Sequence, residues 1–146
     1  MPDSSAPPLP PRYGAPIARS LAKRVMAAAV AEAERHGWPM AIAVVDSTSH
    51  LVLFERLDQT QHGSIRIAID KAKTAVDLRR PTRALEDAVA AGGAGHRVLS
   101  LRGVVAFEGG LPLLVDGEVV GGIGVSGMPS ALDVQVAEAG AAALAG

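Results

Sequence analysis

The residues LPLLVDGEVVGGIGVS (111–126) contain the clearest secondary-structure signal in the chain. Two apolar runs, Leu111–Val115 and Glu118–Ser126, are separated by Asp116-Gly117. The central positions of such a two-residue turn need positive φ angles, which Asp and Gly adopt more readily than other residues. The stretch therefore predicts a β-hairpin, and with it an antiparallel sheet.

A second hairpin is predicted in the first half of the chain. Met40–Asp46 is a short apolar run typical of a buried strand, and His50–Leu57 alternates between two sides. The polar residues Ser47-Thr48-Ser49 between them indicate the turn. Gly103–Phe107 is predicted as one further strand.

Helical periodicity fills most of the remaining sequence. Ser64 is expected to cap the second helix, and Asp133 is expected to complete a capping box at the start of the last one. Arg97–Leu101 has no clean period and is expected to be a loop. The predicted helices are Ile17–Gly37, Ser64–Leu78, Pro81–Val89 and a final helix from Ser130 through Ala143.

This order of elements predicts an α+β fold: a mainly antiparallel sheet flanked by packed helices, since no regular strand–helix–strand crossover is present. The 146 residues suit one domain with one core. We expect the domain to span residues 17–146. Residues 1–16 hold six of the ten prolines and are expected to form a flexible N-terminal arm.

Composition excludes several classes of function. The formal net charge of −1 and the four aromatic residues disfavour nucleic acid as a partner. The lack of cysteine excludes thiolate zinc sites and covalent c-type haem. The longest apolar run, Met40–Val45, is too short to span a membrane, and no signal peptide is recognised, so a cytoplasmic location is expected.

Two glycine-rich segments are candidates for a binding surface. Gly122–Gly127 matches the dinucleotide-binding pattern G-x-G-x-x-G, but the second parallel strand that such a site needs is missing. Glycines there more simply allow a backbone, a helix or a ligand to approach closely. Gly109, Gly110 and Ser126 are therefore candidate ligand-binding residues, although tight packing would explain the same glycines.

Lys71 is the most unusual charged residue of the predicted second helix. At about 100° per residue its side chain lies between the apolar columns of Ile67, Ala68 and Ala75. It is a snorkelling surface residue, a partner in a salt bridge, or a ligand-binding or catalytic amine. Only the last two predict substantial burial.

Three further charged residues are placed near irregular backbone. Asp46 and Arg56 end the two strands of the first hairpin, and Glu108 precedes the glycine pair. Asp46 and Glu108 are candidates for moving a proton, and Arg56 is a candidate for binding an anion. Asp46 would equally serve as a turn former, and Glu108 as a solvated loop acid.

The four histidines show no metal-ligand spacing, so a site built from protein ligands alone is not predicted. A single axial ligand to a cofactor metal needs only one histidine. His62 and His96 are the candidates because both lie next to irregular segments. Each is otherwise an ordinary loop histidine.

Met40–Leu144 resembles the GlcG/HbpS family, haem-binding-protein-like domains that also form the C-terminal part of PduO-type proteins. The resemblance implies a profilin-like layered sandwich, a homo-oligomer built from dimers, and haem or a corrinoid as ligand. The matching motifs are Ala43–Asp46, His50-Leu51, Phe54–Asp58, Ser64-Ile65, Ala68–Ala72, Thr74-Ala75, Arg80–Thr82, Gly109–Leu113, Gly117–Gly121 and Ile123–Gly127.

Two functional hypotheses follow. In the first, a homo-oligomer binds haem or a related tetrapyrrole noncovalently, with His62 or His96 as axial ligand and Arg56 or Lys71 pairing with the propionates. In the second, a cofactor-free isomerase or tautomerase uses Lys71 to hold a substrate carboxylate and Asp46 or Glu108 to move a proton. An accessory subunit without a ligand is the third alternative.

Overall fold

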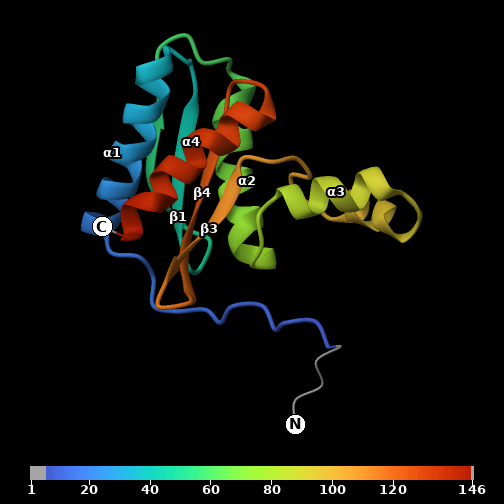
Figure 1. Cartoon of the computed structure of the whole chain (residues 1–146). Helices are drawn as coiled ribbons and strands as arrows, with labels where there is room; N and C mark the ends of the chain where they lie inside the picture. The colour runs from blue at the N-terminus through green and yellow to red at the C-terminus, as the bar shows by residue number, and fades with distance from the viewer. Residues whose placement is uncertain (1–5, 146) are drawn as a thin grey trace.

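A four-stranded antiparallel sheet with strand order β2-β1-β4-β3 lies at the centre of the domain (Figure 1). The structure is a computed structural model and describes residues 6–145. The strands are β1 (Ala41–Asp46), β2 (Leu51–Arg56), β3 (Gly110–Val115) and β4 (Glu118–Ser126).

Helices cover both faces of the sheet. One face is covered by α1 and α4, which also pack on each other, and the opposite face by α2 (Figure 1). The third helix packs against the 3-10 helix η1, and the two project from the body together. The helices are α1 (Arg19–His36), α2 (Gly63–Leu78), α3 (Arg83–Ala91), η1 (Gly93–Ser100), α4 (Ser130–Ala142) and the 3-10 turn η2 (Ala143–Ala145).

This arrangement confirms the predicted α+β layered sandwich. Strand β1 runs through its middle and is buried on both faces. Ile42 and Val44 belong to the core cluster on the α1 and α4 side, whereas Ala41, Ala43 and Val45 belong to the cluster on the α2 side. The small side chains on the α2 side allow that helix to lie close to the sheet.

The glycines of β4 are explained by the same close packing. A Cβ atom at Gly124 would lie 2.0 Å from the carbonyl oxygen of Ala68, and one at Gly122 would lie 2.6 Å from that of Ala72. Both carbonyls belong to α2. The G-x-G-x-x-G match is thus a surface on which a helix packs.

Both predicted hairpins are confirmed. Strands β1 and β2 pair antiparallel, and so do β3 and β4. Asp116 and Gly117 have φ angles of 52° and 77°, as their turn requires.

The strand predicted at Gly103–Phe107 is wrong. These residues form an irregular segment outside the sheet. The backbone N–H of Val105 donates to the hydroxyl of Thr74 on α2, at 3.1 Å, instead of to a neighbouring strand. The predicted loop at Arg97–Leu101 is also wrong over most of its length, since η1 extends to Ser100.

Neither predicted helix cap forms. Helix α2 begins at Gly63 without a side-chain cap, because the Ser64 hydroxyl is buried against Ser126 instead. Helix α4 begins at Ser130, also without one. Asp133 does reach back to the chain before its helix, but it accepts from the N–H of Met128.

Part of the N-terminal arm is attached to the domain. The N–H of Val119 donates to the carbonyl of Arg12 at 2.8 Å, and the Tyr13 hydroxyl donates to the carbonyl of Val76 at 2.7 Å. These bonds connect the arm to β4 and to the end of α2. Residues 1–5 lie outside the described part of the chain, so the predicted flexibility of the arm as a whole stays a prediction.

Candidate functional site

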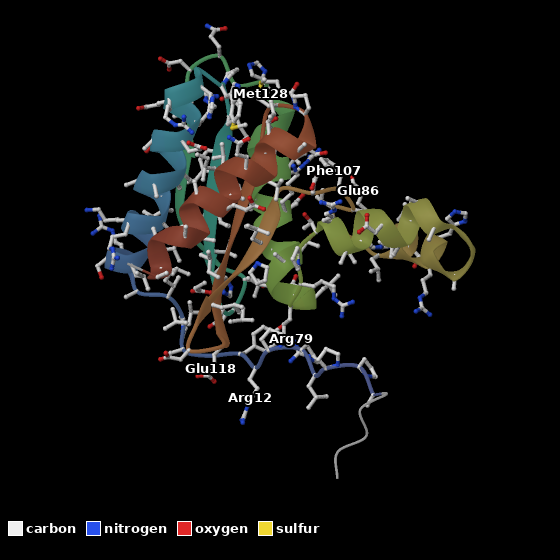
Figure 2. The ribbon with its side chains drawn as sticks, in the orientation of Figure 1. Arg12, Arg79, Glu86, Phe107, Glu118 and Met128 are labelled. Carbon is white, nitrogen blue, oxygen red and sulfur yellow. The ribbon has the colours of Figure 1, made fainter. Side chains whose placement is uncertain are left out.

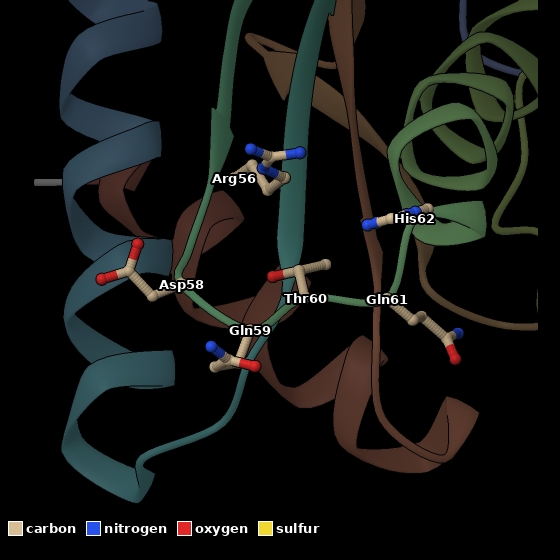
Figure 3. Close-up of a pocket in the computed structure, with 6 residues that line it drawn as sticks. All are labelled: Arg56, Asp58, Gln59, Thr60, Gln61 and His62. Carbon is tan, nitrogen blue, oxygen red and sulfur yellow. The ribbon is translucent and has the colours of Figure 1, made fainter.

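The connection from β2 to α2 forms one side of a polar pocket with a volume of about 550 Å³ (Figure 3). Arg56 is the last residue of β2, and His62 immediately precedes α2. The two residues proposed separately as anion and metal ligands therefore belong to one pocket. It is lined by Arg56, Asp58, Gln59, Thr60, Gln61 and His62.

The shape of this connection is set by a tight turn. Gln59 has a φ angle of 67°, in the left-handed region. The buried Thr60 hydroxyl donates to the carbonyl of Leu57 at 2.6 Å. In Figure 3 the ring of His62 points toward the middle of the pocket, and the guanidinium of Arg56 lies across from it.

Ser126 lies behind this pocket. Its hydroxyl donates to that of Ser64 at 3.0 Å, and the side-chain amide of Gln61 donates to the same Ser64 oxygen at 2.9 Å. Ser126 is only 4% exposed. It therefore supports a pocket residue through Ser64, and a ligand in the pocket would not meet its hydroxyl directly.

The second cluster of predicted residues surrounds Lys71. The side chain of Lys71 is fully buried, which excludes the snorkelling alternative and leaves the two alternatives that predict burial. Its ammonium donates to the backbone carbonyl of Val125 at 2.9 Å and to the carboxylate of Asp133 at 3.1 Å. The ring of Phe107 lies 4.6 Å from the nitrogen, within cation–π distance.

Asp133 lies on α4, in the layer opposite α2, so this ion pair connects the two layers across the end of the sheet. Burial lowers the pKa of Lys71 below its ordinary value, although the charge of Asp133 opposes the change. Burial likewise raises the pKa of Asp133, and the charge of Lys71 opposes that change. Both changes in pKa favour transfer of a proton from Lys71 to Asp133, which would leave both groups neutral.

The glycine pair and Glu108 lie next to Lys71. A Cβ atom at Gly109 would lie 2.6 Å from the Lys71 nitrogen, and one at Gly110 would lie 2.4 Å from its carbonyl oxygen. Glu108 is largely covered and lies 3.9 Å from Arg83. The glycine pair is thus explained by tight packing, which was the alternative to ligand binding. Glu108 is partly buried, so it is not the fully solvated loop acid of the alternative interpretation.

Asp46 and His96 lie apart from both clusters. The Asp46 carboxylate accepts from the N–H and the hydroxyl of Thr48, at 2.8 and 2.6 Å, as a turn former does. Burial raises the pKa of Asp46, but the hydrogen bonds from Thr48 and His50 outweigh it, so the pKa lies below its ordinary value. His96 lies in η1, on the projecting part of the domain.

Sequence reasoning missed three residues that shape these clusters. Asp133 was considered only as a helix cap, because nothing in the sequence indicated its pairing with Lys71. Phe107 was assigned to a strand. Thr60 carried no signal beyond its position between Asp58 and Ser64. Within residues 6–145, no three His, Asp or Glu side chains are grouped so as to bind a metal ion by themselves.

These features define a class: a small α+β domain with an antiparallel sheet between two helical layers and a polar pocket where β2 joins α2. Comparison with known proteins identifies it further. The chain belongs to the HbpS-like family, whose model, described as "Haem degrading protein HbpS-like", matches residues 17–142. Within residues 6–145 no helix has the length and apolar character needed to span a bilayer.

Related proteins include Protein GlcG of Escherichia coli K12, which is 37% identical over 110 residues, 75% of this chain and 81% of GlcG. A structure of a Streptomyces reticuli HbpS double mutant has a TM-score of 0.82 and 34% identity, covering 96% of this chain and 98% of that one. A structure described as a PduOC:heme complex has a TM-score of 0.80 and 28% identity, covering 88% and 94%. Corrinoid adenosyltransferase PduO of Salmonella typhimurium is 34% identical, but the match covers only 35% of its length.

Proposed function

We propose that the protein binds haem, or a related tetrapyrrole such as a corrinoid, in the pocket between β2 and α2. His62 would hold the metal of that group, and Arg56 would pair with one of its carboxylates. The observation that carries the proposal is that these two residues, one suited to a metal and the other to a carboxylate, line the same pocket.

The size of the pocket and the accessibility of His62 support a ligand of this class. Its volume of about 550 Å³ lies within the usual range of about 300–1,000 Å³ for small-molecule sites. His62 is exposed, so its ring can reach a metal without displacing a protein partner. Lys71 is less suited to a propionate because its ammonium is already hydrogen-bonded to Asp133.

Relatives support the same class of ligand. The family model names haem degradation, and a structural neighbour is described as a heme complex. His62 is a better candidate than His96, because the latter lies on the projecting part of the domain and lines none of the polar pocket.

The proposal includes a homo-oligomer built from dimers, because the pocket of one chain lacks the apolar surface that a tetrapyrrole needs. Every side chain that lines the pocket is polar, whereas the faces of a tetrapyrrole are apolar and need a dry surface. A second copy of the chain placed over the pocket would supply that surface. The proposed location remains the cytoplasm.

Haemin titration followed by absorbance spectroscopy tests the proposal. The wild-type protein is expected to give a Soret band, which His62→Ala shifts and weakens while the matched control His96→Ala leaves it unchanged. Arg56→Ala is expected to raise the Kd about 10- to 100-fold, the equivalent of a lost charge-assisted hydrogen bond of about 1.5–3 kcal/mol. Arg66→Ala, at a nearby exposed arginine outside the pocket, is the control for general charge loss.

Native mass spectrometry of the purified protein gives the subunit count and any retained ligand together. Absence of a Soret band in the wild type, together with no retained tetrapyrrole in the native mass spectrum, would contradict the proposal and favour an accessory subunit without a ligand. Loss of the band in His96→Ala and not in His62→Ala would place the site elsewhere.

A further inference from the structure

The region around Lys71 contains chemistry that tetrapyrrole binding does not use. Lys71 and Asp133 are 0% and 2% exposed, and their charged atoms lie 3.1 Å apart. A buried pair of this kind seldom adds stability compared with apolar residues of the same size. A further role for the amine therefore merits a direct test.

A partly exposed aromatic side chain covers this amine. Phe107 lies over the Lys71 nitrogen at 4.6 Å, yet 39% of Phe107 is exposed. The residues around it, 104–109, have no regular secondary structure. Figure 2 labels Phe107 on the side of the domain from which α3 projects. Rotation of one side chain would therefore open a path to the amine.

The amine also has a proton acceptor in contact with it. Transfer of a proton from Lys71 to Asp133 leaves a neutral amine beside a carboxylic acid. Burial favours this transfer, because it lowers the pKa of Lys71 and raises that of Asp133. A neutral amine is the form of lysine that attacks carbonyl carbon.

The charges around the site select against anionic compounds. Glu86 and Glu108 both act electrostatically on Lys71 and repel a carboxylate. Arg83 is the nearby cation, and it lies 3.9 Å from both Glu108 and Asp87. An uncharged carbonyl compound is therefore the expected partner.

We propose that Lys71 is a nucleophile that forms an iminium ion with a small uncharged aldehyde or ketone, with Phe107 as the gate. The Lys71 nitrogen gives its proton to Asp133 and bonds to the carbonyl carbon. Asp133 returns this proton to the oxygen of the adduct, takes a second proton from the adduct nitrogen, and passes it to the resulting hydroxyl, which leaves as water. The sum is R–NH₃⁺ plus O=CR′₂ giving R–NH⁺=CR′₂ plus H₂O, with no oxidant or reductant. This inference is independent of tetrapyrrole binding.

Reductive trapping tests the proposal with controls built into the chain. The protein contains three lysines, and the other two, Lys23 and Lys73, are exposed. Native protein is incubated with acetaldehyde and sodium cyanoborohydride, and peptide mass spectrometry measures N-ethylation at each lysine over time. An ordinary lysine with a pKa of about 10.4 is neutral in only about one molecule in 2,500 at pH 7. We expect Lys71 to react at least about tenfold faster than Lys73 under these conditions.

Two variants and a second carbonyl compound complete the design. Phe107→Ala is expected to speed labelling of Lys71 without changing labelling of Lys73, which lies on the same helix. Asp133→Asn is expected to slow it, with circular dichroism confirming the fold. Pyruvate, which carries a carboxylate, is expected to label Lys71 more slowly than acetaldehyde.

The labelling pattern of the native protein decides whether the proposal holds. Labelling of Lys23 and Lys73 with none at Lys71 would overturn the proposal and leave the amine a purely structural partner of Asp133. Labelling that occurs only after Phe107 is removed would overturn it too, because the native gate would then stay closed. Faster reaction with pyruvate would overturn the assignment of an uncharged substrate.

Discussion

Replacing Asp133 by Ala is expected to destabilise the domain by about 3–5 kcal/mol. The change removes the partner 3.1 Å from the Lys71 nitrogen and leaves a fully buried ammonium with the Val125 carbonyl and the Phe107 ring, neither of which carries a negative charge. Breaking a buried ion pair on one side costs this much because the remaining charge is uncompensated. The acceptor for the Met128 N–H is lost as well.

Urea unfolding followed by circular dichroism measures the loss. With a slope of about 2 kcal/mol per M for a domain of this size, the midpoint should fall by roughly 1.5–2.5 M. The double variant Lys71→Met, Asp133→Leu removes both charges and keeps similar volumes. It should recover at least half of the loss, because apolar replacements of buried pairs are often neutral or stabilising.

The dependence on pH separates charge from packing in the single variant Lys71→Met. Asp133 then keeps its burial but loses the opposing cation, so its pKa stays above the unfolded value of about 3.8. A carboxyl with a raised folded pKa binds more protons in the folded state than in the unfolded state. Stability should therefore be greatest at low pH and fall as the pH rises through the folded pKa of Asp133. If the double variant is as unstable as Asp133→Ala, or if Lys71→Met shows no such fall, the buried charge is not the cause.

Three further predictions concern the framework around the sites. Gly124→Ala places a Cβ 2.0 Å from the Ala68 carbonyl oxygen and should lower the free energy of unfolding, measured in urea, by about 1–3 kcal/mol. The control Gly63→Ala has open space around it and should lower this free energy by less than about 1 kcal/mol. Equal losses would contradict the packing explanation. Asp46→Asn should make the free energy of unfolding depend less on pH under acidic conditions. The lowered pKa of Asp46 gives stability that is present above about pH 3.8 and lost as the pH falls through the folded pKa. An unchanged pH dependence would contradict this prediction. Tyr13→Phe should lower the free energy of unfolding by about 1 kcal/mol, because it removes the hydrogen bond from the arm to the Val76 carbonyl on α2. No change in the urea midpoint would mean that this bond contributes nothing to stability.

Local patterns predicted the sheet well because hairpins are encoded by neighbouring residues. Asp116-Gly117 specified its turn, and the alternation in His50–Leu57 specified the edge strand. The strand at Gly103–Phe107 was wrong for a reason that no local pattern contains. Its backbone is paired with the Thr74 hydroxyl, a contact between residues 31 positions apart.

The candidate sites likewise combine local features that the sequence predicts with contacts between distant residues that it does not predict. Periodicity along one helix placed Lys71 among apolar neighbours three and four residues away, but it left open whether the side chain is buried or snorkels to the surface. Its partner Asp133 lies 62 positions further along, on a helix of the opposite layer. Arg56 and His62 were each recognised singly, because a strand end and a helix start are visible in sequence. They line one pocket because the chain turns at Gln59, which has a left-handed φ angle. The sequence did not indicate this turn, because glycine and asparagine are the residues that usually adopt such an angle.

Both sites contact the end of β4. Ser126 ends β4 and supports the pocket through Ser64, while its neighbour Val125 accepts a hydrogen bond from Lys71. A change in the position of α4, which carries Asp133, would therefore act on Lys71 directly and on the pocket only through β4. Binding at the pocket should accordingly alter Lys71 labelling little unless a second copy of the chain also displaces Phe107. Measuring acetaldehyde labelling with and without haemin distinguishes these cases: an unchanged rate at Lys71 indicates two independent sites, and a changed rate with Lys73 constant indicates coupling through the cover of the amine.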